Sequence, residues 1–501
     1  MKENKRIRRT QVKRWGGGLL AFVIINFVLR MLLIPINAGE YTDGILQLTQ
    51  FYEPTSLWPP LYTALCWPLS LIVGPLWSGR VVSALFSTAA VIPIYLMALR
   101  CFGARAAVFA ALMYTVAPVS LRWAPRVMTD ATFSFFFWCA CDRILAAQAA
   151  LDRAEANRAL AWACAWGTLA TATRYQGFML IPPVVAVAIY HWVQHKFFPL
   201  KGVMSILMYT LIVPWLLHVG MLHGQQFEER TANLGAQMLL IVGEPFLLYI
   251  PYFLTYPVAL LTMLGMNQGR ARPRHSMMPI TLYVLAVLFV AQSLFGSFQE
   301  RYFLPFFGFC YIYAGLGLAI MDHRYRRRCP RLRPYIPIVT CVWSLFVAAL
   351  VLIGSREAFS DVRSAAKYVR ELAPQSNEER AYTNEGWWHF QSRATAAPQM
   401  RFFSGRMVFG LTEEYLSGRI PLRHGDLVIL SSRYDDGRQA ARLAEHYRLQ
   451  PLKTFHAAVT PIFPDIMSIP NTDQSMMAWA YRYVPQNFST TVYRIEAPAG
   501  R

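Results

Sequence analysis

The chain of 501 residues is 55% hydrophobic, 14% aromatic and only 15% charged. This composition excludes an ordinary soluble globular protein and indicates an integral membrane protein. The net formal charge of +20 is explained most simply by lysines and arginines that orient the chain in the membrane. A nucleic-acid partner is not expected, because no basic stripe alternates with exposed aromatic residues in a soluble segment.

Long apolar runs recur through the first 354 residues and predict membrane-spanning helices. A helix needs about 20 residues to cross about 30 Å of hydrocarbon, and the run from Trp15 to Pro35 carries only Arg30 as a charged residue. Eleven spans are expected, at about 16–36, 80–99, 104–121, 131–149, 159–173, 177–194, 203–221, 245–264, 279–296, 302–321 and 335–354. The expected fold class is an α-helical polytopic membrane protein.

Residues 60–77 form a further apolar run that is not expected to cross the membrane. The run is short and is interrupted by prolines, which break helical hydrogen bonding. If it does not cross and the basic start of the chain is cytoplasmic, every later basic loop also falls on the cytoplasmic side. The run is therefore predicted to be a juxtamembrane or re-entrant segment of a first outer loop at 37–79.

Residues 355–501 change in character and predict a small α/β domain on the extracytoplasmic face. Charged and turn residues become frequent there, and none of the eight cysteines occurs in this part. The predicted elements are helices at about 360–372, with Ser360 as the cap, and 435–447, and strands at about 426–430 and 490–495. The predicted domains are a membrane domain at 1–354 and an extracytoplasmic domain at 355–501.

Ionisable residues gather at the outer ends of the predicted spans, and few occur at mid-depth. They are Glu40, Asp43, Arg122, Arg126, Asp130, Arg174, Glu228, Glu229, Arg230, Glu300 and Arg301. A transporter usually needs ionisable groups at mid-depth, so this distribution favours chemistry at one membrane surface. Arginines can hold a phosphate through bidentate hydrogen bonds, and a nearby carboxylate can deprotonate an acceptor. Glycosyl transfer from a lipid-linked phosphate donor combines these functions.

Five short motifs, in this order, resemble the dolichyl-phosphate-mannose–protein mannosyltransferase family (glycosyltransferase family 39). They are Gly-Glu40-Tyr-Thr-Asp43-Gly, Trp-Pro59-Pro60-Leu-Tyr62, Arg126-Val-Met-Thr-Asp130, Thr173-Arg174-Tyr-Gln-Gly177 and Glu300-Arg301-Tyr302-Phe-Leu-Pro305. The resemblance covers about residues 15–354. It implies a GT-C fold and an inverting transfer from a polyprenyl-phosphate sugar on the extracytoplasmic side. The family includes bacterial aminoarabinose transferases that act on lipid A, but the lysine before their proline is replaced here by Trp58.

The resemblance implies a catalytic acid in the first outer loop. Asp43 fits this place best, and Glu40, three residues earlier, is the alternative; in a helix, this spacing would put both acids on one face. Asp130 matches the second-loop acid of the family and is expected to orient the acceptor or tune the base. The alternative for Asp130 is structural, with Thr129 or Asp130 capping the fourth span.

The resemblance also implies ligands for the donor. Arg301 and Tyr302 are expected to hold its phosphate, with Arg126 and Arg174 as further phosphate ligands. The alternative for these residues is anchoring at the membrane border, where arginine and tyrosine are common. The segment with Pro60 and Tyr62 is expected to contact the substrate.

The expected partners are a polyprenyl-phosphate sugar donor, membrane lipids and a protein or glycolipid acceptor. No cofactor is expected, although outer carboxylates together with phosphate could hold a divalent metal. The expected location is the cell inner (plasma) membrane, with a cytoplasmic N-terminus and an extracytoplasmic C-terminal domain. Two other classes stay open. A transporter or flippase of lipid-linked sugars would carry paired repeats and buried charges, and a non-catalytic membrane scaffold would bind a partner through its outer domain.

Overall fold

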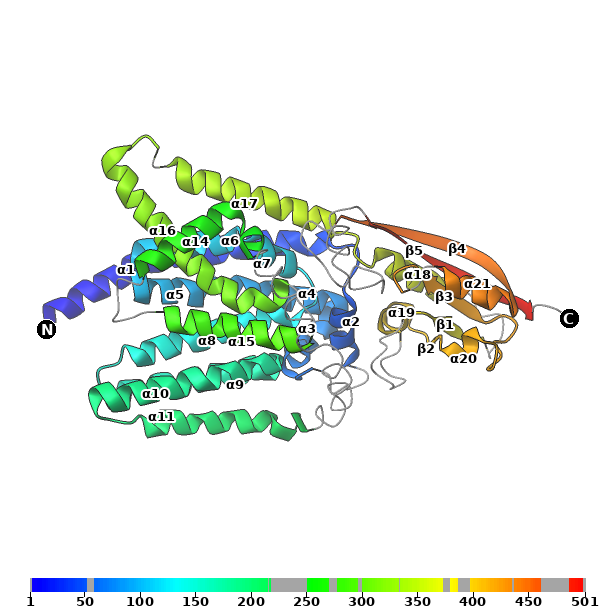
Figure 1. Cartoon of the computed structure of the whole chain (residues 1–501), viewed down its shortest axis with the longest axis horizontal. Helices are drawn as coiled ribbons and strands as arrows, with labels where there is room; N and C mark the ends of the chain where they lie inside the picture. The colour runs from blue at the N-terminus through cyan, green and yellow to red at the C-terminus, as the bar shows by residue number, and fades with distance from the viewer. Residues whose placement is uncertain are drawn as a thin grey trace. The chain divides into compact units, whose positions relative to one another are not determined.

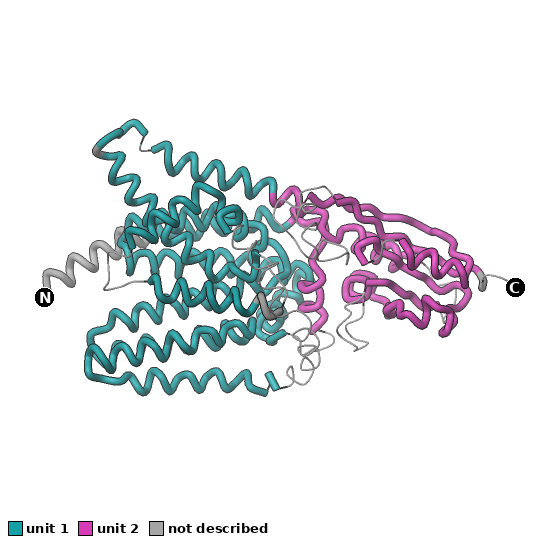
Figure 2. Tube along the Cα trace, viewed as in Figure 1, with its two compact units in different colours: residues 1–34, 56–350 teal, residues 35–55, 351–501 magenta. Residues whose placement is uncertain are grey.

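A computed structural model of the chain (Figure 1) describes residues 2–51, 58–214, 216–217, 250–269, 277–295, 300–332, 334–372, 379–385, 397–434, 437–460 and 486–498. The chain divides into two compact units (Figure 2). Unit 1 comprises residues 1–34 and 56–350, and unit 2 comprises residues 35–55 and 351–501. Part of the expected first outer loop therefore packs with the C-terminal part of the chain.

Unit 1 is built from helices, as its apolar runs predict. In chain order they are α1 (Lys2–Leu33), η1 (Ile34–Ile36, which leads into unit 2), α3 (Leu61–Val73), α4 (Pro75–Ala89), α5 (Val91–Phe102), α6 (Ala104–Thr115), α7 (Pro118–Trp123), α8 (Thr129–Gln148), α9 (Arg153–Thr173), η2 (Tyr175–Leu180), α10 (Ile181–His195), α11 (Leu200–Met204), η3 (Ser205–Ile212), α14 (Tyr256–Gly269), α15 (Met278–Phe295), η6 (Glu300–Phe303), α16 (Leu304–Arg328) and α17 (Tyr335–Gly354). The predicted helical class is confirmed.

Five helical stretches of the described chain are long and apolar enough to cross a membrane. They are Gly18–Ile36, Pro75–Phe102, Tyr175–His195, Glu300–Arg326 and Tyr335–Gly354. In their most apolar parts, 17% of Gly18–Ile36 and 28% of Tyr335–Gly354 is buried, against 89% of Glu300–Arg326. Glu300–Arg326 thus forms the centre of unit 1, while Gly18–Ile36 and Tyr335–Gly354 present apolar side chains to their surroundings. The run at 60–77 contains α3, whose 13 residues are too few to cross about 30 Å, and its last three residues begin α4.

Glycines let α16 pack closely against its neighbours α14 and α6. A Cβ atom at Gly317 would collide with the main-chain carbonyl of Leu261 in α14, and one at Gly315 would collide with the main chain of Ala110 in α6. Small residues at such crossings bring helix backbones together, which strengthens van der Waals packing where the hydrophobic effect cannot drive association. These contacts fix α16, and with it the η6 turn that precedes it.

A buried arginine connects α1 to two other helices of unit 1. The Arg30 guanidinium donates through Nε to Ser87 Oγ of α4 at 2.7 Å and through Nη2 to Ser120 Oγ of α7 at 3.0 Å. It also donates to Asn26 Oδ1 and lies 4.9 Å from the centroid of the Tyr114 ring. A buried cation is tolerated when its N–H groups are satisfied in this way. The only charged residue of the first predicted span is therefore part of the packing.

Unit 2 contains a five-stranded mixed sheet with the strand order β2-β1-β3-β5-β4. The strands are β1 (Ala381–Thr383), β2 (Val408–Gly410), β3 (Leu427–Ser431), β4 (Tyr447–Val459) and β5 (Gln486–Pro498). β1 pairs in parallel with β2 and β3, whereas β5 pairs antiparallel with β3 and β4. Val428, Leu430 and Ile495 of this sheet lie in one apolar core with Leu443 and Tyr447.

The helices of unit 2 are α2 (Thr42–Thr49), α18 (Ser360–Glu371), α19 (Pro398–Ser404), α20 (Glu413–Leu416) and α21 (Arg438–Ala444). Four of the elements predicted for the tail are therefore present, as α18, α21, β3 and β5. The predicted cap at Ser360 is wrong, because the cap position is Phe359 in a left-handed conformation and makes no side-chain cap hydrogen bond. Both α18 and α2 pack against α19.

Candidate active site

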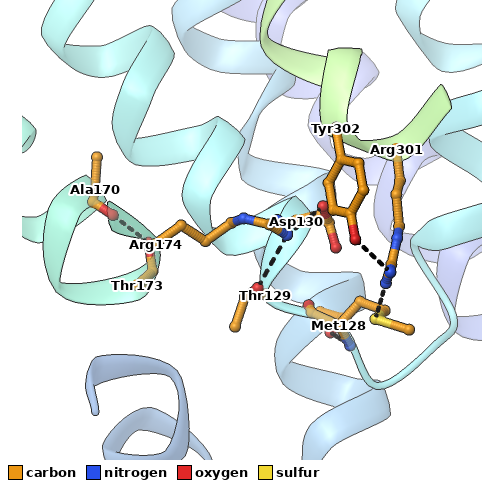
Figure 3. A network of polar contacts seen from close by, with 9 residues as sticks. Met128, Thr129, Asp130, Ala170, Thr173, Arg174, Arg301 and Tyr302 are labelled. Carbon is orange, nitrogen blue, oxygen red and sulfur yellow. Dashed lines mark hydrogen bonds and ion pairs between the residues drawn. The ribbon is translucent and has the colours of Figure 1, made fainter. Parts of the chain in front are cut away.

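Three segments of unit 1 bring charged side chains together at helix ends (Figure 3). The first runs from α7 to the start of α8, the second is the residue after α9, and the third is η6. The charged residues that form the cluster are Arg122, Asp130, Arg174, Glu300 and Arg301, and all except Arg174 are at most 2% exposed. The cluster thus draws its members from positions that lie far apart in the sequence.

Asp130 and Arg174 form an ion pair within this cluster. Asp130 lies in the first turn of α8, and Arg174 is the cap residue that ends α9 in an extended conformation (φ −152°, ψ 135°). The Arg174 main chain still donates to the Ala170 carbonyl, while its Nη1 lies 2.6 Å from Asp130 Oδ1. The helix end therefore sets the direction of the guanidinium, and the carboxylate fixes its position (Figure 3).

Tyr302 lies between two guanidinium groups, as Figure 3 shows. The ring centroid is 5.0 Å from Cζ of Arg174 and 4.8 Å from Cζ of Arg301. Arg301 Nη2 also donates to the Tyr302 hydroxyl at 2.9 Å. Cation–π contacts of this kind hold an arginine plane against an aromatic face. Tyr302 thereby keeps two positive groups close to each other despite their mutual repulsion.

Arg301 is further enclosed by residues of the α7–α8 turn. Its Nη1 lies 2.9 Å from the Met128 sulfur, and its Cζ is 5.3 Å from the centroid of the Trp123 ring. The neighbouring Glu300 accepts hydrogen bonds from Arg122 and, at 3.1 Å, from Trp123 Nε1. The η6 turn is therefore held to α7 and to the turn after α7 by both of its charged residues.

The cluster contains more positive than negative groups. It holds the guanidiniums of Arg122, Arg174 and Arg301 and the carboxylates of Asp130 and Glu300. Asp130 Oδ2 is buried and has no hydrogen-bond partner within the described ranges. The arrangement can therefore attract an anion and also offers a carboxylate oxygen that can accept one more hydrogen bond.

The predicted cap role for the start of α8 is wrong. The cap residue is Met128, in an extended conformation, and no side chain makes a cap hydrogen bond there. The Asp130 side chain pairs with Arg174 instead, and Thr129 Oγ1 lies 3.4 Å from the same arginine. An ion pair between distant helix ends has replaced the local interaction that the sequence suggested.

Other predicted site residues have different surroundings. Arg126 lies in the α7–α8 turn and is fully buried, while Pro60 is the exposed residue at the start of α3. Tyr62 is buried, and its hydroxyl donates to the Gly79 carbonyl at 2.9 Å and lies 2.9 Å from Ser83 Oγ. The predicted phosphate and substrate roles of these residues stay predictions. Residues 228–230, which were predicted to lie at the outer end of a span, are outside the described part of the chain.

Glu40 and Asp43 belong to unit 2 and are buried there. Asp43 lies in the first turn of α2, but Glu40 precedes the helix, which begins at Thr42 after the cap residue Tyr41. The helix that would present both acids on one face therefore does not include Glu40. Their catalytic roles stay predictions.

Arg122, Trp123 and Glu300 are members of the cluster to which the sequence analysis gave no role. Arg122 and Glu300 were recognisable as outer charged residues, but their pairing joins positions that are 178 residues apart. Among the described residues, no group of three or more His, Cys, Asp or Glu is arranged to hold a metal ion.

Comparison with known proteins identifies the class of this chain. Residues 58–218 match the sequence profile of the family described as dolichyl-phosphate-mannose-protein mannosyltransferase. No curated protein sequence matches the chain. The predicted resemblance to this mannosyltransferase family is confirmed over the matched segment. The apolar helices of unit 1 indicate a multi-pass membrane protein, and the matched segment is similar to glycosyltransferases.

Solved structures show the same fold over most of the chain. ArnT from Cupriavidus metallidurans in the apo state is 16% identical with a TM-score of 0.57, and the alignment covers 87% of this chain and 96% of that one. The same protein bound to undecaprenyl phosphate gives a TM-score of 0.59 at the same identity and coverage. The archaeal oligosaccharyltransferase AglB from Archaeoglobus fulgidus, in complex with an inhibitory peptide and a dolichol-phosphate, is 13% identical with a TM-score of 0.50. This alignment covers 86% of the present chain and 73% of AglB. The predicted GT-C fold is confirmed.

Proposed function

We propose that the protein is an inverting glycosyltransferase that moves a sugar from a polyprenyl-phosphate donor to a protein, lipid or glycan acceptor on the extracytoplasmic face. The observation that carries this proposal is the buried cluster around Tyr302, in which Arg174 and Arg301 from distant parts of the sequence contact one tyrosine ring. Two guanidiniums held close together attract an anion. A phosphate is suited to this place, because its oxygens match the planar donor fork of arginine.

A lipid carrier suits this cluster better than a soluble phosphate compound. The charged residues lie at the ends of α8, α9 and α16, and the body of α16 is apolar. A polyprenyl chain can stay in the hydrocarbon that surrounds the exposed apolar side chains of unit 1, while its phosphate lies at the helix ends. In support, ArnT has been solved with undecaprenyl phosphate and AglB with a dolichol-phosphate.

In the proposed reaction, an oxygen or nitrogen of the acceptor attacks the anomeric carbon of the sugar. The bond between this carbon and the phosphate oxygen breaks, and polyprenyl phosphate leaves with the electron pair. Arg174 and Arg301 stabilise the negative charge that develops on the phosphate. The proton of the acceptor passes to a carboxylate acting as a general base.

We assign the base to Asp43, with Glu40 as the alternative, on the strength of the family resemblance. Asp130 receives a different role, because Oδ1 is occupied by Arg174 and Oδ2 is available to accept a hydrogen bond. This oxygen is suited to orient a hydroxyl or amine of the acceptor.

The proposal is tested by binding of undecaprenyl phosphate to the purified protein, compared with undecaprenol, which lacks the phosphate. Arg301→Met should weaken phosphate binding by about 10- to 100-fold, because a hydrogen bond to a charged group contributes roughly 1.5–3 kcal/mol. The exposed Arg442, which pairs with Glu413, provides the matched control Arg442→Met. Equal binding of the two lipids, or unchanged binding by the Arg301 variant, would contradict the proposed site.

A further inference from the structure

The segment that carries Glu40 and Asp43 is fixed by residues from the C-terminal part of unit 2. The Ala38 main chain donates to the Arg356 carbonyl at 2.9 Å, and the Ala38 carbonyl accepts from Arg363 Nη1 at 2.7 Å. The rings of Tyr41 and Phe359 pack edge to face with centroids 5.6 Å apart. The acidic segment is thus held by the turn before α18 and by α18 itself.

A side-chain hydrogen bond holds the start of α2. Gln399 Nε2 donates to Thr42 Oγ1 at 3.0 Å, and both residues are buried. Thr42 is the first residue of α2 and directly precedes Asp43. The hydroxyl next to the proposed base is therefore held by a buried residue of the C-terminal part of unit 2.

Gln399 is itself held in place by a buried carboxylate. Glu385 accepts the main-chain N–H groups of Gln399 at 3.1 Å and of Met400 at 2.9 Å. These are the first-turn donors of α19 that have no partner inside the helix. A continuous series of contacts thus runs from Glu385 through the start of α19 and Gln399 to Thr42.

The length of α2 explains why these contacts matter. The helix has 8 residues, and helices shorter than about 12–15 residues are marginal without tertiary contacts. The direction of the Asp43 side chain therefore depends on what α2 packs against. A buried amide-to-hydroxyl bond is directional, whereas the apolar packing around it is not.

We infer that Thr42 and Gln399 are positioning residues through which the C-terminal domain sets the orientation of Asp43 for proton abstraction. The inference rests on the proposed function, since it assigns the outer domain a part in the same reaction. It gives residues 351–501 a role in catalysis that requires no contact of their own with the donor.

The test compares Thr42→Val, which removes the hydroxyl at nearly constant shape, with Thr42→Ser, which keeps it. Thr42→Val should lower kcat about 3- to 10-fold, the effect of losing one neutral hydrogen bond. Because the donor phosphate is proposed to bind to unit 1, the KM for the donor should not change. Gln399→Met removes the same bond from the other side and should have the same effect. The control is Thr454→Val, which makes the same change at an exposed position of β4.

The rescue variant separates positioning from general stability. The inference predicts wild-type kcat for Thr42→Ser and Thr454→Val, and reduced kcat for Thr42→Val and Gln399→Met in folded, monodisperse protein. Wild-type kcat in both Thr42→Val and Gln399→Met would overturn the inference. An equal loss of kcat in Thr42→Ser and Thr42→Val would overturn it as well.

Amide hydrogen exchange distinguishes failure of this inference from failure of the proposed function. Absence of transfer by the wild-type protein with every donor would refute the proposed function. Even then, residues 37–50 should exchange faster in Thr42→Val and Gln399→Met than in the wild type and Thr454→Val, because the helix start has lost a partner. Unchanged exchange in both variants would overturn the positioning role.

Discussion

Protonation of the buried Glu385 should make the stability of unit 2 depend on pH. Burial is the main cause that raises the pKa of this carboxyl from 4.5 to about 7, and the negative charge of Asp361 adds to it, while the N–H groups of Met400 and Gln399 act in the opposite direction. The perturbation that tests this is Glu385→Gln, which keeps an acceptor oxygen for the α19 main chain but removes the titrating group.

The sign and size of the effect follow from proton linkage. Between pH 4.5 and about 7, folded Glu385 holds a proton that the unfolded chain has lost. The free energy of unfolding should therefore decrease as the pH rises through this window. A shift from 4.5 to about 7 corresponds to about 3–4 kcal/mol, at roughly 1.4 kcal/mol for each pH unit. Below this window the contribution of protonated Glu385 to the free energy of unfolding is fully present, and above the window it is lost.

The assay is hydrogen exchange of the β3 amides (Leu427–Ser431) in the full-length protein, corrected for the intrinsic effect of pH on exchange. The wild type should lose protection as the pH rises from 4.5 to 7, and Glu385→Gln should lack this loss. Glu414→Gln, at an exposed position, is the control and should follow the wild type. Parallel profiles for the wild type and Glu385→Gln would refute the reasoning.

Three further predictions concern unit 1. Arg174→Met should destabilise unit 1 by about 3–5 kcal/mol, because it leaves Asp130 as an uncompensated buried charge. Adding Asp130→Asn in a double variant should recover most of this stability, as measured by thermal unfolding. Tyr302→Leu should weaken undecaprenyl phosphate binding more than Tyr302→Phe, because phenylalanine keeps both cation–π contacts and loses only the hydroxyl. Gly317→Ala should lower the midpoint of thermal unfolding because its Cβ meets the α14 main chain, whereas Gly18→Ala, with no atom within 4 Å, should not.

Much of the fold was predictable because apolar runs and turn residues act locally. The helix expected at 335–354 is α17 (Tyr335–Gly354), and the strand expected at 426–430 is β3 (Leu427–Ser431). The run at 60–77 contains the short helix α3 and the start of α4, and its juxtamembrane position stays a prediction. Segment length and composition were sufficient to place the helix α17 and the strand β3.

Contacts between distant segments were not predictable in the same way. The motifs indicated that Asp130, Arg174 and Arg301 belong to one site, but not that Tyr302 lies between two of the guanidiniums. Nor did the sequence indicate that residues 35–55 pack with the C-terminal domain, since this depends on contacts such as that of Gln399 with Thr42. No periodicity or spacing connects positions that are 357 residues apart.

The central claim is tested most directly by sugar transfer from a polyprenyl-phosphate donor. Purified protein in lipid vesicles is supplied with a panel of polyprenyl-phosphate hexoses and pentoses and an envelope extract as acceptor, and release of polyprenyl phosphate is measured. The wild type should release the carrier with at least one donor. Asp43→Asn should reduce this release by about 100-fold or more, the usual contribution of a general base. Movement of intact donor between leaflets without cleavage, or full activity of Asp43→Asn, would contradict the account.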